Sequence, residues 1–149
     1  MNSCAIWRRM KIFWLLLGLS FWATPLLATP FTDNGNSTVT DQATGLIWDQ
    51  QETSTMTWEA ALAYCEGLSL ASQTDWRLPN RNELQSLVDY TKTSAPTIDT
   101  TAFPSAVSGN YWSSTTYALN STYAWLVSFG NGYVNFNSKP YNIYVRCVR

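Results

Sequence analysis

The sequence predicts a single α+β domain, and three features support this class. Residues 39–48 have the pattern of a short β-hairpin, the segments that begin near residues 58 and 81 have the caps and apolar spacing of helices, and residues 110–149 have the alternation of antiparallel strands. Strands that precede and follow a pair of helices are typical of the α+β class. The 121 residues that begin at Thr29 suit one domain.

Residues 1–28 have the features of a secretory signal peptide. Arg8, Arg9 and Lys11 precede the apolar residues 12–23, and the small residue Ala28 suits a cleavage site. Twelve apolar residues are fewer than the roughly 20 that a membrane-spanning helix needs, so we expect no transmembrane anchor. The paired arginines also allow a twin-arginine signal, but general secretion suits a domain that forms a disulfide after export.

The expected domain boundaries follow from this signal. Residues 29–38 are short and polar and are predicted to be a flexible lead-in, and residues 39–149 form the domain. We expect an exported protein that is periplasmic, secreted or held at the cell surface.

The first helix is predicted over residues 58–66. Thr57 can cap its first turn, and Gly67 occupies the position where a left-handed residue commonly ends a helix. Apolar residues recur at helical spacing and place Cys65 on the buried side.

The second helix is predicted to begin at Arg81. Asn80 and Glu83 have the spacing of a capping box, in which each side chain bonds to the other residue's backbone N–H. Its apolar stripe is Leu84, Leu87 and Val88. Of the residues around this start, Trp76 and Leu78 are expected in the core, and Arg77 and Arg81 are expected to pair with acids or carbonyls.

After the second helix, residues 90–109 read as a long surface loop anchored by Ile98 and Phe103. Asn131 and Gly132 then predict a two-residue turn between two strands, and residues 143–149 alternate as a last strand. In the strand after the turn, alternation places Val134 and Phe136 in the core and projects Tyr133, Asn135 and Asn137 to the other side.

Two cysteines, Cys65 and Cys147, remain after the expected signal. An even number in an exported domain favours a disulfide, which would close a loop of 82 residues. The alternative, two free thiols acting in catalysis, is disfavoured because no residue supplies the usual activating base.

The composition excludes several classes of function. The chain has no histidine, which excludes Ser-His-Asp and Cys-His catalysis and histidine-ligated zinc. No close pair of carboxylates suggests a glycosidase, and the mature chain, with a net charge near −4, lacks the basic surface that nucleic acid requires. We therefore expect no enzyme activity, no cofactor, no metal and no nucleic-acid partner. Calcium is the alternative for metal, since Asp89, Asp99 and Asn110 offer oxygens near the long loop.

The last third of the chain is rich in residues that suit recognition. Residues 109–149 hold six Tyr, six Asn and five Ser, and such side chains stack on and hydrogen-bond to ligands. Strands also favour Tyr and turns favour Asn, so the composition is compatible with an ordinary sheet. The candidate ligand-binding residues are Tyr117, Asn120, Tyr133, Asn135, Asn137 and Tyr141.

Several separated motifs, in order, resemble the DUF1566 family, also called the Lcl C-terminal domain. They are the string DQATGLIW at residues 41–48, the helix that carries Cys65, the string WRLPNRNEL at residues 76–84, YWSS at residues 111–114 and VRCVR at residues 145–149. The resemblance implies a C-type lectin-like fold, related to that of formylglycine-generating enzymes, in which a long-range disulfide joins the first helix to the last strand. It also implies a glycan-binding or adhesive role, with a glycan or a cell-surface protein as partner. The alternative is a protein-interaction or envelope-assembly module.

Overall fold

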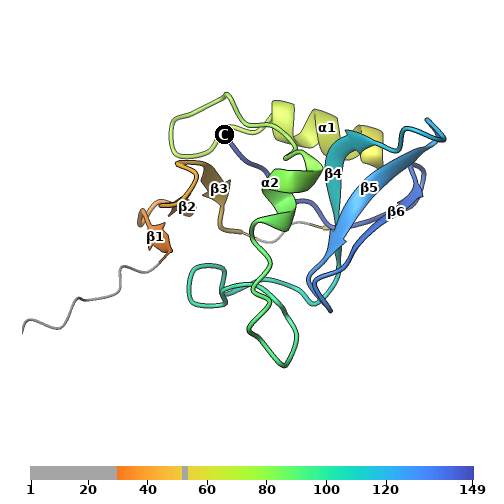
Figure 1. The fold of residues 1–149 in the computed structure, drawn as a ribbon. Coiled ribbons are helices and arrows are strands. Elements are labelled where there is room, and N and C mark those ends of the chain that lie inside the picture. Colours follow the sequence, from red (N-terminus) through yellow and green to blue (C-terminus); the bar gives the residue numbers. More distant parts are fainter. Residues whose placement is uncertain (1–29, 52–53) are drawn as a thin grey trace, which may run out of the picture.

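The computed structural model describes residues 30–51 and 54–149, which form two small antiparallel sheets and two helices (Figure 1). The expected signal peptide lies outside the described residues. No helix in the described residues is long and apolar enough to cross a membrane. The elements in chain order are β1 (Phe31–Asp33), β2 (Thr38–Asp41), β3 (Ile47–Asp49), α1 (Trp58–Glu66), α2 (Arg81–Gln85), β4 (Asn110–Thr116), β5 (Tyr123–Ser128) and β6 (Val134–Ser138).

The first sheet has the order β1-β2-β3 and contains the predicted hairpin. Asp41 shapes the turn between β2 and β3, because its carboxylate accepts hydrogen bonds from the Ala43 N–H and the Thr44 hydroxyl. Strand β1 was not predicted from the sequence. It lies within the stretch predicted to be a flexible lead-in and pairs antiparallel with β2.

Helix α1 has the predicted bounds, and Thr57 caps it by accepting a hydrogen bond from the Ala60 N–H. The predicted left-handed end is wrong: Gly67 has φ −86°, in the right-handed region. The disulfide between Cys65 and Cys147 is confirmed, and both residues are fully buried. It fixes α1 to the end of the chain.

Helix α2 starts at Arg81, and the predicted capping box is present in full. The helix has only five residues, so Leu84 alone of the predicted stripe lies on it, although Leu84, Leu87 and Val88 are all buried as expected. Together with Val127 of β5 and Phe103 of the long loop, that stripe belongs to one of the two clusters that make up the core. The other cluster lies against α1 and includes Trp76 and Leu78, as predicted.

The second sheet has the order β4-β5-β6. The predicted hairpin between β5 and β6 is present, but residues 129–132 make a longer turn than the two residues expected, and Gly132 has the left-handed φ of 76°. The alternation of β6 is as predicted, since Phe136 lies opposite Trp125 whereas Asn135 and Asn137 lie opposite Leu126 and Ala124. The prediction that Phe136 is a core residue is wrong, because it is 39% exposed.

Residues 143–149 do not form the predicted continuous strand but join the two sheets through isolated bridges. Arg149 exchanges backbone hydrogen bonds with Ile47 of the first sheet, and Tyr144 bonds to β4 of the second. Both sides of this segment are buried, including the side chain of Arg146, which donates to the backbone carbonyl of Asp49. The alternation predicted for residues 143–149 therefore does not separate a buried face from an exposed one.

Candidate functional site

Four aromatic rings form a continuous surface on one face of the second sheet. Trp125 and Phe136 are direct partners across β5 and β6, and their ring centroids are 5.7 Å apart. Tyr117 stacks on Phe136 at 4.1 Å, with the ring planes 11° from parallel, and Tyr123 meets Phe136 edge-on at 5.9 Å. We call these four residues the aromatic platform.

The strands explain why these rings gather. Alternation puts Tyr123 and Trp125 on the same face of β5, and cross-strand pairing brings Phe136 beside them. Tyr117 follows β4 directly, and its N–H donates to the carbonyl of Tyr123, which closes the β4–β5 turn and brings its ring over Phe136.

The platform is exposed because α2 is short. Leu84 of the helix and Leu87 just after it cover the end of this sheet face at Val127, in the same core cluster. The helix begins beside Trp125, where Arg81 lies over the ring, and leaves the other half of the face uncovered. Trp125 and its neighbours are consequently only partly buried, and Phe136 is exposed.

A shallow hollow of about 320 Å³ adjoins the platform at the start of α2. Trp125 forms part of its lining, and the guanidinium of Arg81 lies 4.9 Å from the centroid of the Trp125 ring. The other lining residues are Asn80, Asn82, Thr115, Thr116 and Ala118. The lining therefore offers amide, hydroxyl and guanidinium groups but no carboxylate.

Of the two kinds of partner predicted for Arg81, it has a side-chain carbonyl and not an acid. In the described residues it forms no ion pair, and its Nε and Nη2 donate at 3.3 Å to the side-chain oxygen of Asn82. Its backbone N–H donates to the Thr115 hydroxyl, which ties the start of α2 to β4. The guanidinium thus faces the hollow without a neutralising carboxylate, and the remaining donors are available to a ligand.

The neighbouring Arg77 has the structural role that was predicted. Its guanidinium donates to both carboxylate oxygens of Glu83 at 2.8 Å, and Glu83 also accepts the Asn80 N–H. The hydrogen bonds from Arg77 hold the pKa of Glu83 below its usual value. This arrangement fixes the first turn of α2 and hence the position of Arg81.

The residues predicted to bind ligand do not share one surface. Tyr117 belongs to the platform, whereas Asn120 caps the β4–β5 turn by accepting from the N–H and the hydroxyl of Thr122. Asn135 and Asn137 lie on the opposite face of β6. Tyr133 and Tyr141 are 71% and 61% exposed, but they lie before and after β6, at its two ends.

Sequence reasoning overlooked Trp125, Phe136 and Arg81 as site residues. Phe136 was expected in the core, Trp125 was not singled out, and Arg81 was expected to pair with an acid or a carbonyl. A usable signal was present: two paired strands with Tyr, Trp and Phe on one face expose aromatic rings wherever that face is left uncovered.

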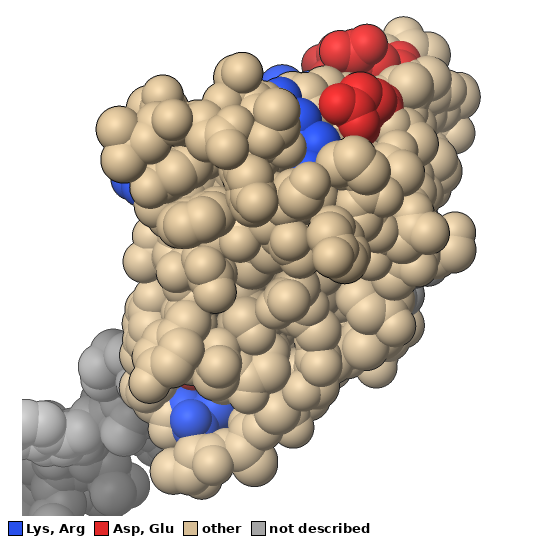
Figure 2. Space-filling view, turned by 90° about the vertical axis from the view of Figure 1, so that its right-hand side faces the viewer, with Lys and Arg blue, Asp and Glu red and all other residues tan. Residues whose placement is uncertain are grey.

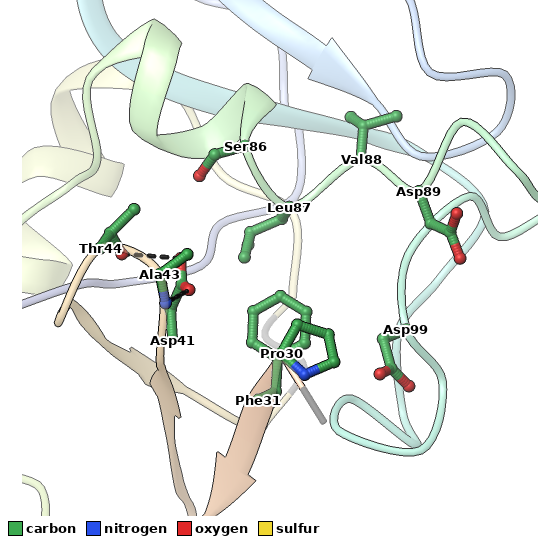
Figure 3. A pocket seen from close by; sticks show the side chains of 10 residues that line it. All are labelled: Pro30, Phe31, Asp41, Ala43, Thr44, Ser86, Leu87, Val88, Asp89 and Asp99. Carbon is green, nitrogen blue, oxygen red and sulfur yellow. Dashed lines mark hydrogen bonds between the residues drawn. The ribbon is translucent and has the colours of Figure 1, made fainter. Parts of the chain in front are cut away.

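A second hollow, of about 290 Å³, lies between the first sheet and the long loop (Figure 3). Phe31, Leu87 and Val88 make it largely apolar, and Figure 3 shows Asp89 and Asp99 on the side of the long loop, across from Asp41. All three carboxylates accept local hydrogen bonds, those of Asp89 from Thr91 and those of Asp99 from the N–H groups of Thr101 and Ala102. The described residues contain no cluster of three or more groups that could hold a metal ion.

No protein of curated function matches this chain. The family model of the Lcl C-terminal domain matches residues 37–149, which include the platform, the hollow beside it and both cysteines of the disulfide. The motifs that suggested this family are thus found together in one continuous match, and the chain belongs to the Lcl C-terminal domain family.

Proposed function

We propose that this chain is an exported, non-catalytic binding domain with a C-type lectin-like fold that recognises a glycan on the aromatic platform. The observation that carries the proposal is the position of the Trp125 ring, partly exposed between the stacked Tyr117–Phe136 pair and the polar hollow. The C–H face of a sugar ring packs on an aromatic ring, while its hydroxyls need hydrogen-bond partners at the edge. The platform and the hollow supply both.

The polar groups beside Trp125 suit hydroxyl recognition. Arg81 and Asn82 offer N–H donors, and Thr115 and Thr116 offer hydroxyls that donate and accept. These groups project from the start of α2 and the end of β4, two elements joined by the hydrogen bond from the Arg81 N–H to Thr115. A ligand would therefore meet a rim that is held in place before binding.

Two features favour binding without catalysis. The sequence has no histidine, and the residues that line the hollow include no carboxylate, so the pair of acids that glycoside hydrolysis commonly uses is not found there. The buried disulfide also suits an oxidising compartment outside the cytosol, in keeping with the expected signal peptide.

The test is a glycan array probed with the purified domain and with variants that share its fold. Trp125→Ala and Arg81→Gln should each weaken binding to the captured glycan by about tenfold or more, since a ring contact and a charged donor are each worth one to a few kcal/mol. Tyr141→Ala removes a more exposed ring outside the platform and should bind normally. Thermal melts show that each variant is folded.

Other outcomes point elsewhere. If Tyr133→Ala with Asn135→Ala abolishes binding while Trp125→Ala binds normally, the site is the set first predicted from the sequence. If no glycan is captured and the domain instead retains a protein partner in a manner that requires Trp125, the platform serves a protein-interaction module.

A further inference from the structure

Strand β6 forms an open edge of the second sheet. The sheet order is β4-β5-β6, and Figure 1 shows no other element beyond β6. The Ser128 N–H donates to the Tyr133 carbonyl, and the Lys139 N–H donates to the Thr122 carbonyl. These two bonds show which residue pairs of β5 and β6 are hydrogen-bonded and which are not. Val134, Phe136 and Ser138 belong to non-hydrogen-bonded pairs, so their backbone groups point away from β5.

Two of these outward N–H groups already have partners. The side-chain oxygen of Asn135 accepts the N–H of Phe136 at 2.8 Å, and that of Asn137 accepts the N–H of Ser138 at 2.8 Å. An added strand would place its carbonyl oxygens at these same two N–H groups. The side-chain oxygen of each asparagine therefore occupies the place that a carbonyl oxygen of an added strand would need.

The usual protections of an edge strand are otherwise missing from β6. Its five residues include no charged side chain and no proline, and its pairing with β5 runs over five consecutive residues without a bulge. Figure 2, which views the side of the molecule to the right in Figure 1, shows a broad uncharged surface with charged side chains towards its margins. The exposed ring of Phe136 adds apolar surface at this edge. An edge of this kind is a candidate for pairing with another chain.

We propose that Asn135 and Asn137 keep the β6 edge closed, and that the strand this edge accepts when they are removed is β6 of a second copy. The outward groups of Val134, Phe136 and Ser138 are centred on Phe136, so two copies of β6 can pair antiparallel about a twofold axis at that residue. Val134 of one copy then lies opposite Ser138 of the other, and no like charges meet. This pairing brings the two aromatic platforms side by side.

The proposal is tested with the double variant Asn135→Ala/Asn137→Ala, measured by light scattering across a concentration series. The wild-type domain is expected to remain monomeric, whereas the variant should become dimeric or larger at micromolar to millimolar concentration. Asn142→Ala is the matched control, because Asn142 is exposed and lies outside β6. A further Ser138→Pro substitution in the double variant removes one outward N–H and should restore the monomer.

Hydrogen exchange at the Phe136 and Ser138 amides gives a second readout. At low concentration these amides should exchange faster in the double variant than in the wild-type domain, since their caps are gone, and at high concentration they should become protected by the partner strand. A double variant that stays monomeric at all concentrations, with unchanged exchange, would overturn the proposal. So would association that Ser138→Pro leaves intact, because the contact would then lie elsewhere.

Discussion

Tyr117 stacks on Phe136 with ring centroids 4.1 Å apart, and this pair links the end of β4 to the edge strand of the same sheet. The two rings lie outside the core and yet each contacts Trp125, at 5.3 Å and 5.7 Å between centroids. Exposed rings that support each other lose little freedom when a ligand arrives. The stack therefore gives Trp125 a fixed orientation toward the hollow beside it.

Because this stack is exposed, replacing Phe136 should cost less stability than replacing the buried Phe129. Phe129→Ala should lower the free energy of unfolding by roughly 3 to 5 kcal/mol, because Phe129 is fully buried. Phe136→Ala should cost only about 1 to 2 kcal/mol, since its ring is 39% exposed and loses mainly its aromatic contacts. Urea unfolding of both variants measures the difference. Equal losses would mean that Phe136 is held as firmly as a core residue.

The sequence predicted most of the elements because their signals are local. The capping box of Asn80 and Glu83 and the helical spacing of Cys65 act within one turn, and both are present. It could not predict β1, whose three residues have no periodicity and become a strand only by pairing with β2.

The candidate site escaped prediction for a similar reason. Alternation shows that Phe136 and Val134 share a face, but whether that face is covered depends on how far α2 extends across the sheet. That is a tertiary property. Tyr133 and the asparagines of β6 were chosen by residue type and by alternation, and the structure places them at a turn and along an edge of the sheet.

The capping box predicts a response to acid. Because the pKa of Glu83 is lowered by its hydrogen bonds from Arg77, Glu83 adds stability above its usual pKa of about 4.5, and this is lost as the pH falls through the lowered value. Glu83→Gln should cost at most about 1 kcal/mol at pH 7, because Gln can still accept the Asn80 N–H, and the lost ion pair is screened by solvent since Arg77 is 45% exposed. Thermal melts at pH 7, 5 and 3 should show a smaller acid-induced loss in the variant.

A suitable control for that series is Glu66→Gln, which removes an exposed carboxyl from the end of α1. It should follow the wild-type profile from pH 7 to pH 3. If Glu83→Gln also follows the wild-type profile, the pair with Arg77 contributes nothing to the acid response.

The carboxylates around the second hollow predict no requirement for calcium. Asp41, Asp89 and Asp99 all accept hydrogen bonds from groups in their own turns. Turning these carboxylates toward a calcium ion would break those bonds and disturb the turns. Adding millimolar calcium or a chelator should change the melting temperature by less than about 2 °C. A larger rise with calcium, removed by Asp99→Asn, would show that the long loop forms a metal site.

The disulfide between Cys65 and Cys147 predicts the largest loss of stability. The bridge joins residues 82 positions apart in the sequence. Removing it should lower the free energy of unfolding by roughly 4 to 5 kcal/mol if the unfolded chain gains the full loop entropy. Cys65→Ala/Cys147→Ala should therefore lower the melting temperature by about 10 °C or more.

Burial of this disulfide adds a kinetic prediction. Both cysteines are fully buried, so a mild reductant should act only when the domain opens, and the rate of reduction should follow the rate of unfolding as urea is raised. Mass measurement after alkylation follows the reaction. Rapid reduction in the absence of urea would show that α1 and residues 143–149 separate without global unfolding, and the bridge would then contribute less to the fold than its loop length implies.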